Sequence, residues 1–459
     1  MSTDHESRPT EEQPAAGETV AAPSPLGPVS LGERISSIDV LRGFALLGIL
    51  MINKDLFAYS SSVIHDPTVQ GGFEGLDFAI WRVGYVFFQM KFMALFSMLF
   101  GAGLILMWQR AGEDNPSFRG TYYRRLGWLL LFGLLHAYLL WYGDILFSYA
   151  VCGMVVYLFR RKKARTQIIL GLIVVLFSLV PMFGMGAMMN WMQTTAESAQ
   201  TAIDEGRTPT DLEASMLEAW NETKVGFSPP PEKIAEETEA MRSDFWTIFT
   251  HQAPTTIQMQ TFVMLLFVFW RVAGLMLIGM GLMKLGVLAA QRSTGFYVWC
   301  MVIGYGIGLP ISWYGSEQMV ASDFSVVASY TGANYYDYVF GLFVVLGHIG
   351  LIMLICKLGV LQWLQRRFAA VGRMALTNYL MQTLICTFIF YGWGLGLFGA
   401  VSRSELMLIV IGVWVLQMFY SPLWLERFRF GPAEWLWRTL TYKKKQRMRL
   451  RPKAEAAVA

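Results

Sequence analysis

The amino-acid sequence predicts an all-α protein, a polytopic bundle of about ten transmembrane helices with both termini in the cytoplasm. Three observations support this fold class. The 459 residues are 54% hydrophobic and only 15% charged, which is too apolar for a water-soluble globule. The apolar residues form blocks of about 20, the length that a helix needs to cross the hydrocarbon core. The connections between these blocks are alternately rich and poor in Lys and Arg, as expected of loops on opposite sides of a membrane.

The two ends of the chain differ from the rest in composition. Residues 1–33 are rich in Pro, Ala, Glu, Ser and Gly, so we predict a disordered cytoplasmic tail. No apolar run there ends in a small-residue cleavage site, which argues against a secretory signal peptide. Residues 34–442 are predicted to form the transmembrane domain. Residues 443–459 form a basic cytoplasmic tail, which is suited to bind anionic lipid.

The apolar blocks define the predicted spans in chain order. They cover residues 38–58, 78–108, 126–142, 144–159, 167–190, 256–283, 295–314, 339–358, 375–398 and 405–421. The connection after the fourth block contains Arg160, Arg161, Lys162 and Lys163, whereas 59–77 and 315–338 contain no Lys or Arg. This alternation orients the chain in a plasma membrane, with the basic connections in the cytoplasm.

The segment 191–255 is the one long connection. It is mostly acidic and has Pro229-Pro230-Pro231 in its middle. We predict that it lies outside the cell, either as a solvated cap or partly disordered loop or as a lid over an external site.

The sequence also indicates which cross-links, metals and partners to expect. The four cysteines, Cys152, Cys300, Cys356 and Cys386, lie in apolar stretches and form no CxxC or Cys/His spacing, so no disulfide or metal site is predicted. The expected partners are the lipid bilayer and an anionic small molecule or lipid, with no nucleic acid. An oligomer is compatible with the sequence.

Ionisable and amide groups within predicted spans are costly in a bilayer, so each is a candidate for function. They are Lys91, Arg271 and His348 near mid-depth, Asn53, Arg82 and His136 towards the outer end, and Asp39, Arg42 and Asn378 towards the inner end. Asp39 and Arg42 have the spacing of an i,i+3 ion pair at the entrance of the first helix.

Lys91 and Arg271 are deep cations, and no carboxylate is predicted at comparable depth. Two uncompensated cations would cost several kcal/mol each. Either an anionic group such as a phosphate, pyrophosphate or carboxylate enters beside them, or both side chains snorkel or reach Asp55 or Asp144 from the side.

His136 and Asp144 lie on either side of a predicted tight external turn. At 1.5 Å per residue, His136 would lie about 7 Å deeper than Asp144. A direct contact is therefore not expected, although a water or loop relay is possible. Asp144 alone could be an N-cap, and a histidine in an apolar helix is usually a satisfied core residue.

Several motifs carry a resemblance to a known family. They are Ser37-Ile38-Asp39-Val40-Leu41-Arg42-Gly43, Gly133-Leu134-Leu135-His136, Gly143-Asp144-Ile145-Leu146, Gly372-Arg373-Met374-Ala375-Leu376-Thr377-Asn378-Tyr379 and Gly431-Pro432-Ala433-Glu434-Trp435. Together they resemble the bacterial YeiB-like family of multi-pass membrane proteins, known as domain of unknown function 418, over residues 34–442.

The first helix is also similar to that of transmembrane acyltransferases, including the heparan glucosaminide N-acetyltransferases, through Asp39, Arg42-Gly43 and Asn53. This similarity implies transfer of an acyl group from cytoplasmic acyl-CoA to an acceptor on the far side, with a loop histidine in the chemistry. His65 falls close to that place, but Ile64 and Asp66-Pro67 do not match the pattern. We therefore prefer His136 and keep His65 as the alternative catalytic residue.

The leading hypothesis is an acyltransferase that takes acyl-CoA as donor, without a metal, and modifies an envelope glycan, lipid or small molecule. The catalytic residues would be His136 as general base, assisted by Asp144, and Asn53 as the group that polarises the thioester carbonyl. The predicted substrate-binding residues are Lys91, Arg271, Arg82, Arg42, Arg373 and Asn378. The alternatives are a transporter or flippase of an anionic metabolite or lipid, and a non-catalytic lipid- or quinone-binding protein.

Overall fold

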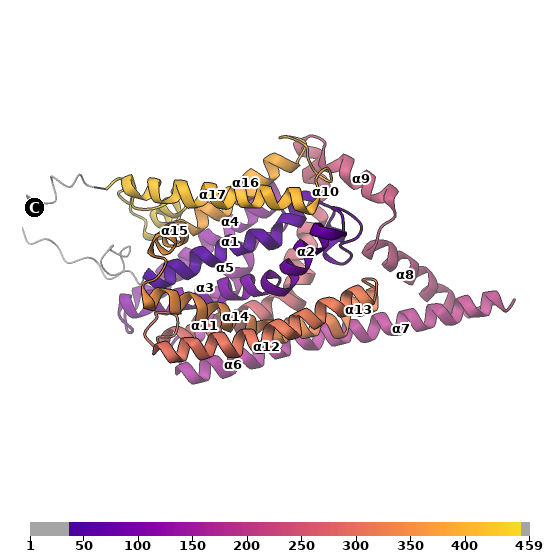
Figure 1. Cartoon of the computed structure of the whole chain (residues 1–459), viewed down its shortest axis with the longest axis horizontal. Coiled ribbons are helices and arrows are strands. Elements are labelled where there is room, and N and C mark those ends of the chain that lie inside the picture. Colours follow the sequence, from indigo (N-terminus) through magenta and orange to yellow (C-terminus); the bar gives the residue numbers. More distant parts are fainter. Residues whose placement is uncertain (1–35, 451–459) are drawn as a thin grey trace, which may run out of the picture.

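A computed structural model describes residues 36–450, apart from the side chains of residues 333 and 334. The predicted tail 1–33 and the end of the tail 443–459 lie outside the described residues. Within the described part the regular structure is all helical, with one isolated bridge between Phe428 and Arg449 and no strand. The all-α prediction is confirmed, and the helices lie side by side as a bundle (Figure 1).

The helices follow one another in this order. They are α1 (Ser36–Ala58), η2 (Ser61–Ile64), α2 (Gly75–Val83), η3 (Gly84–Phe88), α3 (Lys91–Ala111), α4 (Ser117–Leu139), α5 (Leu146–Val156), η4 (Tyr157–Phe159), α6 (Ala164–Phe177), α7 (Leu179–Asp204), α8 (Asp211–Phe227), α9 (Pro231–Met241), α10 (Phe245–Gln258), η5 (Met259–Val268), α11 (Phe269–Lys284), α12 (Thr294–Ala321), α13 (Val326–Tyr330), α14 (Gly332–Leu358), α15 (Gln362–Arg373), α16 (Ala375–Phe390), α17 (Arg403–Arg427) and α18 (Pro432–Tyr442).

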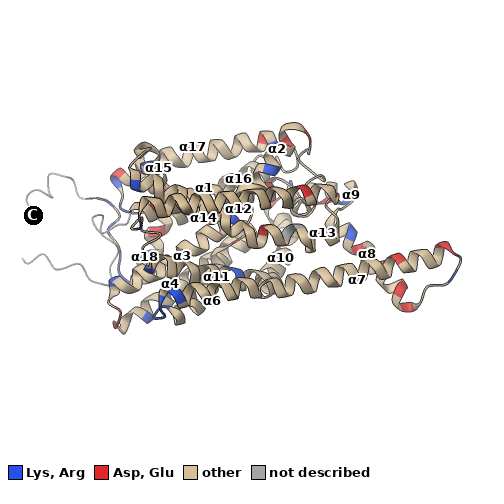
Figure 2. Ribbon diagram, turned by 60° about the horizontal axis from the view of Figure 1, so that its bottom comes forward, with Lys and Arg blue, Asp and Glu red and all other residues tan. Residues whose placement is uncertain are grey.

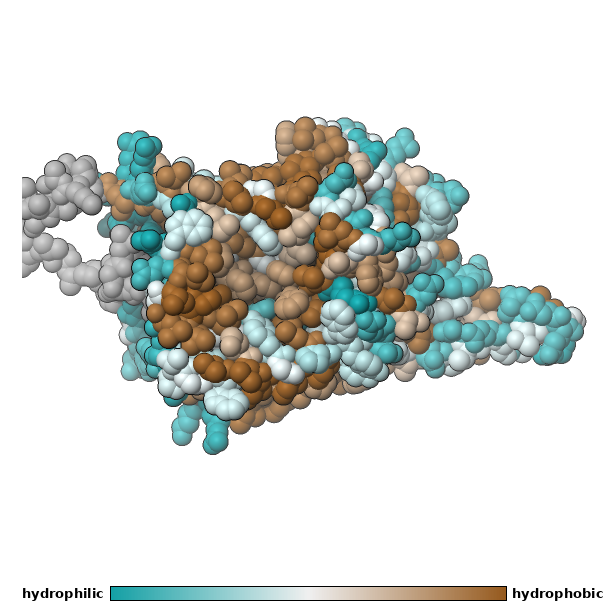
Figure 3. Space-filling model, viewed as in Figure 1, coloured by the Kyte–Doolittle hydropathy of each residue, from teal (hydrophilic) through white to brown (hydrophobic). Residues whose placement is uncertain are grey.

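Among the described residues, 7 helices are long and apolar enough to cross a membrane. Two shorter apolar helices, 146–159 and 375–390, add to them, and α4 carries the apolar block 126–142. Each predicted block therefore overlaps one helix or successive helices, although the block 375–398 extends past the end of α16 at Phe390. Apolar side chains cover the middle of the bundle, and polar ones gather at both ends (Figure 3).

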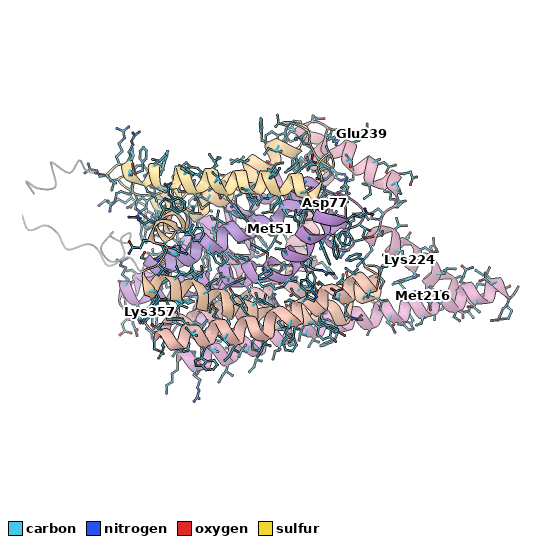
Figure 4. All side chains as sticks on the ribbon, viewed as in Figure 1. Met51, Asp77, Met216, Lys224, Glu239 and Lys357 are labelled. Atoms are coloured by element: carbon cyan, nitrogen blue, oxygen red, sulfur yellow. The ribbon has the colours of Figure 1, made fainter. Side chains whose placement is uncertain are left out.

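Charge divides the two ends of the bundle. Lys and Arg gather at the end near α15 and α18, while Asp and Glu are prominent at the far end, on the α7–α8 hairpin (Figure 2). Lys357 lies at the first end and Glu239 at the other, with Met51 between them (Figure 4). We call these the basic end and the acidic end.

The centre of the bundle is built on close helix crossings. In α1, 72% of the apolar window is buried, against 17% in the α6–α7 span, which faces outward. A Cβ added at Gly43 of α1 would collide with the carbonyl oxygen of Phe368 in α15, and one at Gly101 of α3 with that of Met276 in α11. Small residues thus let these backbones approach, as is usual for helices in a membrane.

The second predicted span is not one continuous helix. The chain breaks at Gln89 and Met90, where Met90 takes the left-handed conformation with φ 62°. Such a conformation is strained for a residue with a Cβ. Lys91 consequently lies at the start of α3 and not in the middle of a long helix.

The segment 191–255 is helical and not partly disordered. It comprises the end of α7, then α8, α9 and the start of α10. A capping box of Thr210 and Glu213 begins α8, and its hydrogen bonds lower the pKa of Glu213. On α9, Glu237 accepts a hydrogen bond from Ser60. This contact places α9 beside the loop after α1.

Candidate functional site

A cavity of about 550 Å³ extends into the bundle from its basic end. Its volume is within the range of small-molecule and cofactor sites. The wall comprises Ile38, Asp39, Arg42 and Ile49 of α1; Phe96, Leu99, Phe100, Gly103, Leu104, Leu106, Met107, Gln109, Arg110 and Ala111 of α3; Phe118, Thr121, Tyr122, Arg125 and Leu129 of α4; Ile145, Leu146 and Tyr149; Gly372 and Arg373 of α15; Ala375, Leu376 and Tyr379 of α16; and Glu434, Trp437, Arg438 and Tyr442 of α18. We call this the arginine cavity.

Cations outnumber anions in its wall. The arginines are Arg42, Arg110, Arg125, Arg373 and Arg438, and the carboxylates are Asp39 and Glu434. The predicted pair is confirmed, with Arg42 Nη1 2.8 Å from Asp39 Oδ1. Glu434 is engaged by the start of α16, accepting from the backbone N–H groups of Leu376 at 2.6 Å and Thr377 at 3.1 Å. Both carboxylates thus have partners in the protein, so the cavity favours an anionic ligand.

The deep part of the cavity is lined mainly by apolar and aromatic side chains. Along α16 the wall is made by Ala375 and Tyr379, which lie one turn apart on one face. The ring of Tyr379 lies 5.1 Å from the ring of His136, centroid to centroid. His136 itself is not part of the wall, so Tyr379 separates it from the arginine cavity.

His136 joins two other polar residues behind Tyr379. Its Nε2 lies 2.9 Å from Thr383 Oγ1, and its Nδ1 lies 2.9 Å from Asp144 Oδ1. The second contact has the distance of an ion pair but not the angle of a hydrogen bond. The three side chains are nearly inaccessible, with exposures of 2% for His136, 1% for Thr383 and 2% for the Asp144 side chain. We call them the His136 cluster.

The expectation that His136 and Asp144 do not meet is wrong. α4 ends at Leu139, and residues 140–145 turn back into the bundle before α5 begins at Leu146. A Cβ added at Gly133 would lie 2.9 Å from Asp144 Oδ2, which puts the carboxylate beside α4. Asp144 Oδ2 also accepts from the backbone N–H of Phe147 at 2.7 Å. The N-cap residue of α5 is Ile145 and not Asp144 as predicted, so the Asp144 carboxylate binds the first turn of α5 from one position further back.

The expectation that Lys91 has no deep carboxylate is also wrong. Lys91 Nζ forms an ion pair with Asp337 and donates to the carbonyl oxygen of Tyr85 at 2.7 Å. Asp337 accepts in addition from Ser312 Oγ at 2.7 Å. α14 begins at Gly332, seven residues before the predicted span, and therefore carries Asp337 into the bundle. We call Lys91, Asp337 and Ser312 the Lys91 cluster.

Arg271 is paired with Tyr338, the residue that follows Asp337. It donates to the carbonyl oxygen of Tyr338 at 2.9 Å, and its guanidinium lies 3.8 Å from the Tyr338 ring centroid. Neither Lys91 nor Arg271 lines the arginine cavity, and each has a partner within the protein. Their role in substrate binding stays a prediction.

Two further residues predicted to bind substrate, Arg82 and Asn378, bind groups on other helices of the protein instead. Arg82 pairs with Glu317 at 2.9 Å and lies over the rings of Phe78 and Trp313. The buried side-chain amide of Asn378 donates to Val371 O and to Ser421 Oγ, both at 3.1 Å, which ties α16 to α15 and α17.

Asn53, His65 and His348 lie apart from the cavity wall. Asn53 is half-buried, one turn beyond the wall residue Ile49 on the same face of α1. His65, in the loop after α1, stacks on Phe227 of α8 with centroids 4.2 Å apart. His348 is satisfied by Tyr305 Oη at 2.8 Å and Phe87 O at 3.0 Å.

Several residues of the site were missed from the sequence. Arg110 belongs to a basic connection that indicates only the orientation of the chain, and Glu434 belongs to a motif without assigned chemistry. Thr383 carries no signal, because a threonine in an apolar helix is ordinary. The one available clue was its spacing, four residues after Tyr379 and on the same helical face.

The chain was also compared with known proteins. Residues 282–444 match the family model described as Protein of unknown function (DUF418). The chain is 32% identical over 432 residues to the uncharacterized protein YxaH of Bacillus subtilis, covering 91% of this chain and 97% of that one. It is 31% identical over 426 residues to the uncharacterized protein YeiB of Escherichia coli, covering 89% and 96%.

A further relative is an uncharacterized 39.9 kDa protein from the amylase 3′ region of Bacillus acidopullulyticus, 25% identical over 438 residues and covered over its whole length. No solved structure matches the chain. The two relatives above 30% identity align over most of their length, so the chain belongs to the YeiB-like DUF418 family of multi-helix membrane proteins.

Proposed function

We propose that the protein is an integral membrane acyltransferase that moves an acyl group from a cytoplasmic thioester to an envelope glycan, lipid or small molecule. One observation carries the proposal. A cavity with five arginines in its wall has an aromatic inner part that ends at Tyr379, and Tyr379 contacts the ring of His136.

The cavity suits the parts of an acyl-CoA. Arginines bind phosphate groups through charge-assisted, often bidentate hydrogen bonds. Arg42, Arg373 and Arg438 are only half-buried, so phosphates could reach them from outside the bundle. The apolar and aromatic wall beyond them suits a pantetheine arm and its acyl group. The positive-inside rule assigns this end to the cytoplasm, where acyl-CoA is found.

The His136 cluster supplies the chemistry. Asp144 orients the imidazole, and His136 takes the proton of the acceptor hydroxyl or amine as the acyl carbon is attacked. The thiolate leaves and is protonated. Asn53, one turn beyond Ile49, is the candidate to hydrogen-bond the oxyanion.

The direct test uses purified protein in nanodiscs, labelled acetyl-CoA and longer acyl-CoAs, and an envelope extract as acceptor. The wild type should release free CoA and move label into the extract, and His136→Ala should do neither. His348→Ala is the matched control, because it removes a buried histidine that lies apart from the cavity wall. A wild-type protein that consumes no thioester of any chain length would refute the proposal.

Orientation has its own test. Single cysteines at Glu213 and Lys163 should react with an impermeant thiol reagent from opposite sides of the membrane. If both cysteines react from outside the cell, the basic end and its arginine cavity face outward, where a cytoplasmic donor could not enter.

A transporter or flippase of an anionic metabolite or lipid is the second candidate. It is favoured by the break at Met90, because substrate sites of transporters often lie at interrupted helices. Accumulation of an anionic solute in proteoliposomes, without thioester consumption, would select it. Binding of a lipid or quinone with neither activity would select a non-catalytic binding protein.

A further inference from the structure

The hydroxyl of Thr383 ends a chain of three polar groups inside the bundle. Thr383 Oγ1 lies 2.9 Å from His136 Nε2, and His136 Nδ1 lies 2.9 Å from Asp144 Oδ1. Hydroxyl, imidazole and carboxylate follow one another as in enzymes that activate a hydroxyl nucleophile. We propose, on the basis of the proposed acyltransferase function, that Thr383 Oγ1 carries the acyl group as a covalent ester between donor and acceptor.

The position of Thr383 fits a nucleophile at the end of the donor site. Ala375 and Tyr379 line the arginine cavity, and Thr383 is the next residue on the same face of α16. Four residues of helix advance about 6 Å. The proposal therefore requires the Tyr379 ring to move aside so that the donor reaches the Thr383 hydroxyl.

Thr383 also differs from a threonine that only fills space. A buried threonine in a helix usually donates to a carbonyl of the preceding turn. Thr387, one turn further on, does so, with its hydroxyl 2.8 Å from Thr383 O. The Thr383 hydroxyl instead contacts a histidine 247 positions away in sequence.

The proposed step requires one tautomer of His136. Its Nε2 must accept from the Thr383 hydroxyl, so the ring proton must lie on Nδ1. Nδ1 is the nitrogen that lies 2.9 Å from Asp144 Oδ1, so a carboxylate is in place to favour this tautomer.

The reaction balances with the donor and acceptor alone. Thr383 Oγ1 attacks the thioester carbonyl, its proton passes to His136 Nε2, the carbon–sulfur bond breaks, and the thiolate takes that proton and leaves. An acceptor hydroxyl or amine then attacks the Thr383 ester, its proton passes to Nε2 and on to the departing Thr383 oxygen. Donor and acceptor therefore need not be bound at the same time.

The test omits the acceptor. Full-length protein in nanodiscs is mixed with labelled acetyl-CoA, and both released thiol and protein-bound label are followed. The wild type should release one equivalent of CoA in a burst and gain one acetyl group, which peptide mass spectrometry places on Thr383 and which hydroxylamine removes. Thr383→Ser should keep the burst, and Thr383→Ala should lose it. Thr387→Ala is the matched control and should keep it.

The outcomes separate this proposal from the proposed function. Steady transfer by wild type with no acylated protein, or wild-type turnover by Thr383→Ala with acceptor present, would mean direct transfer and would overturn the covalent step alone. A wild type that consumes no thioester would overturn both. Size-exclusion profiles of Thr383→Ala and of the isosteric Thr383→Val, which should lose the burst as well, establish whether the loss reflects lost chemistry or lost folding.

Discussion

The Lys91 cluster and the arginine cavity place cations in the same bundle under opposite conditions. Lys91 is 0% exposed, paired with Asp337, and its nitrogen also donates to a backbone carbonyl. Arg42 keeps 27% of its side chain exposed although it is paired with Asp39, and it borders a cavity of about 550 Å³.

This difference shows how to judge a charge inside a membrane protein. Burial in an apolar helix marks Lys91 and Arg42 alike as candidates. A partner on another helix explains Lys91 without any ligand, whereas the adjoining cavity gives Arg42 something to bind. Accessible space next to the charge therefore separates a binding group from a structural ion pair.

The largest effect expected from this comparison is on catalysis at His136. His136→Ala should reduce acyl transfer by on the order of 10²–10⁴-fold, since a general base contributes about that much. The measurement is CoA release with acceptor present, next to the unfolding temperature of the same variant. A variant that keeps more than a tenth of the activity would make His136 a core residue like His348.

The Lys91 cluster should respond in stability and not in substrate affinity. Lys91→Met leaves Asp337 buried without its ion pair, so the free energy of unfolding should fall by about 3–5 kcal/mol. The double variant Lys91→Met/Asp337→Leu removes both charges and should regain much of the loss. Denaturation of purified protein in detergent measures both.

Lys357→Met, at the exposed basic end of α14, is the control and should leave unfolding unchanged. If Lys91→Met folds normally but binds the donor weakly, Lys91 belongs to the substrate site after all, as the sequence predicts.

Much of the fold could be predicted from the sequence because length and apolar composition alone determine a span. The blocks 38–58 and 405–421 lie within α1 and α17. The pair Asp39–Arg42 could be predicted because both residues belong to one helix, whose geometry fixes their separation.

Contacts between helices could not be predicted in this way. Asp337 was placed outside the span because the apolar block starts after it, yet α14 begins five residues before it. Asp144 was placed at the surface because a tight turn was expected where residues 140–145 turn inward. Thr383 meets His136 only through the packing of α16 on α4, which one sequence does not reveal.

The cavity arginines should show an intermediate effect confined to donor binding. Arg42→Ala or Arg373→Ala should each raise the KM for acyl-CoA about tenfold, the equivalent of roughly 1.4 kcal/mol for a lost charge-assisted contact. The kcat should change little, because neither residue reaches the reacting atoms. Added salt should weaken donor binding less in the variants than in wild type, since screening acts on charges that remain.

Arg366→Ala is the matched control, because Arg366 is exposed on α15 and is not part of the cavity wall. If Arg42→Ala, Arg373→Ala and Arg366→Ala raise the KM for acyl-CoA equally, the arginines act only through the overall charge of the basic end. None of them would then hold a phosphate individually.

The smallest effect is expected at His65, the alternative catalytic histidine. His65 lies in the loop after α1, its ring stacks on Phe227 of α8, and burial lowers its pKa. His65→Ala removes one ring contact, for which about 0.5–1.5 kcal/mol of local stability is typical. Acyl transfer should stay within about twofold of wild type, because the stacking holds α8 against the loop and takes no part in moving protons. The comparison with His136→Ala under identical donor and acceptor concentrations decides between the two histidines. A selective loss of transfer in His65→Ala, with His136→Ala active, would move the chemistry to the acidic end and leave the His136 cluster as core packing.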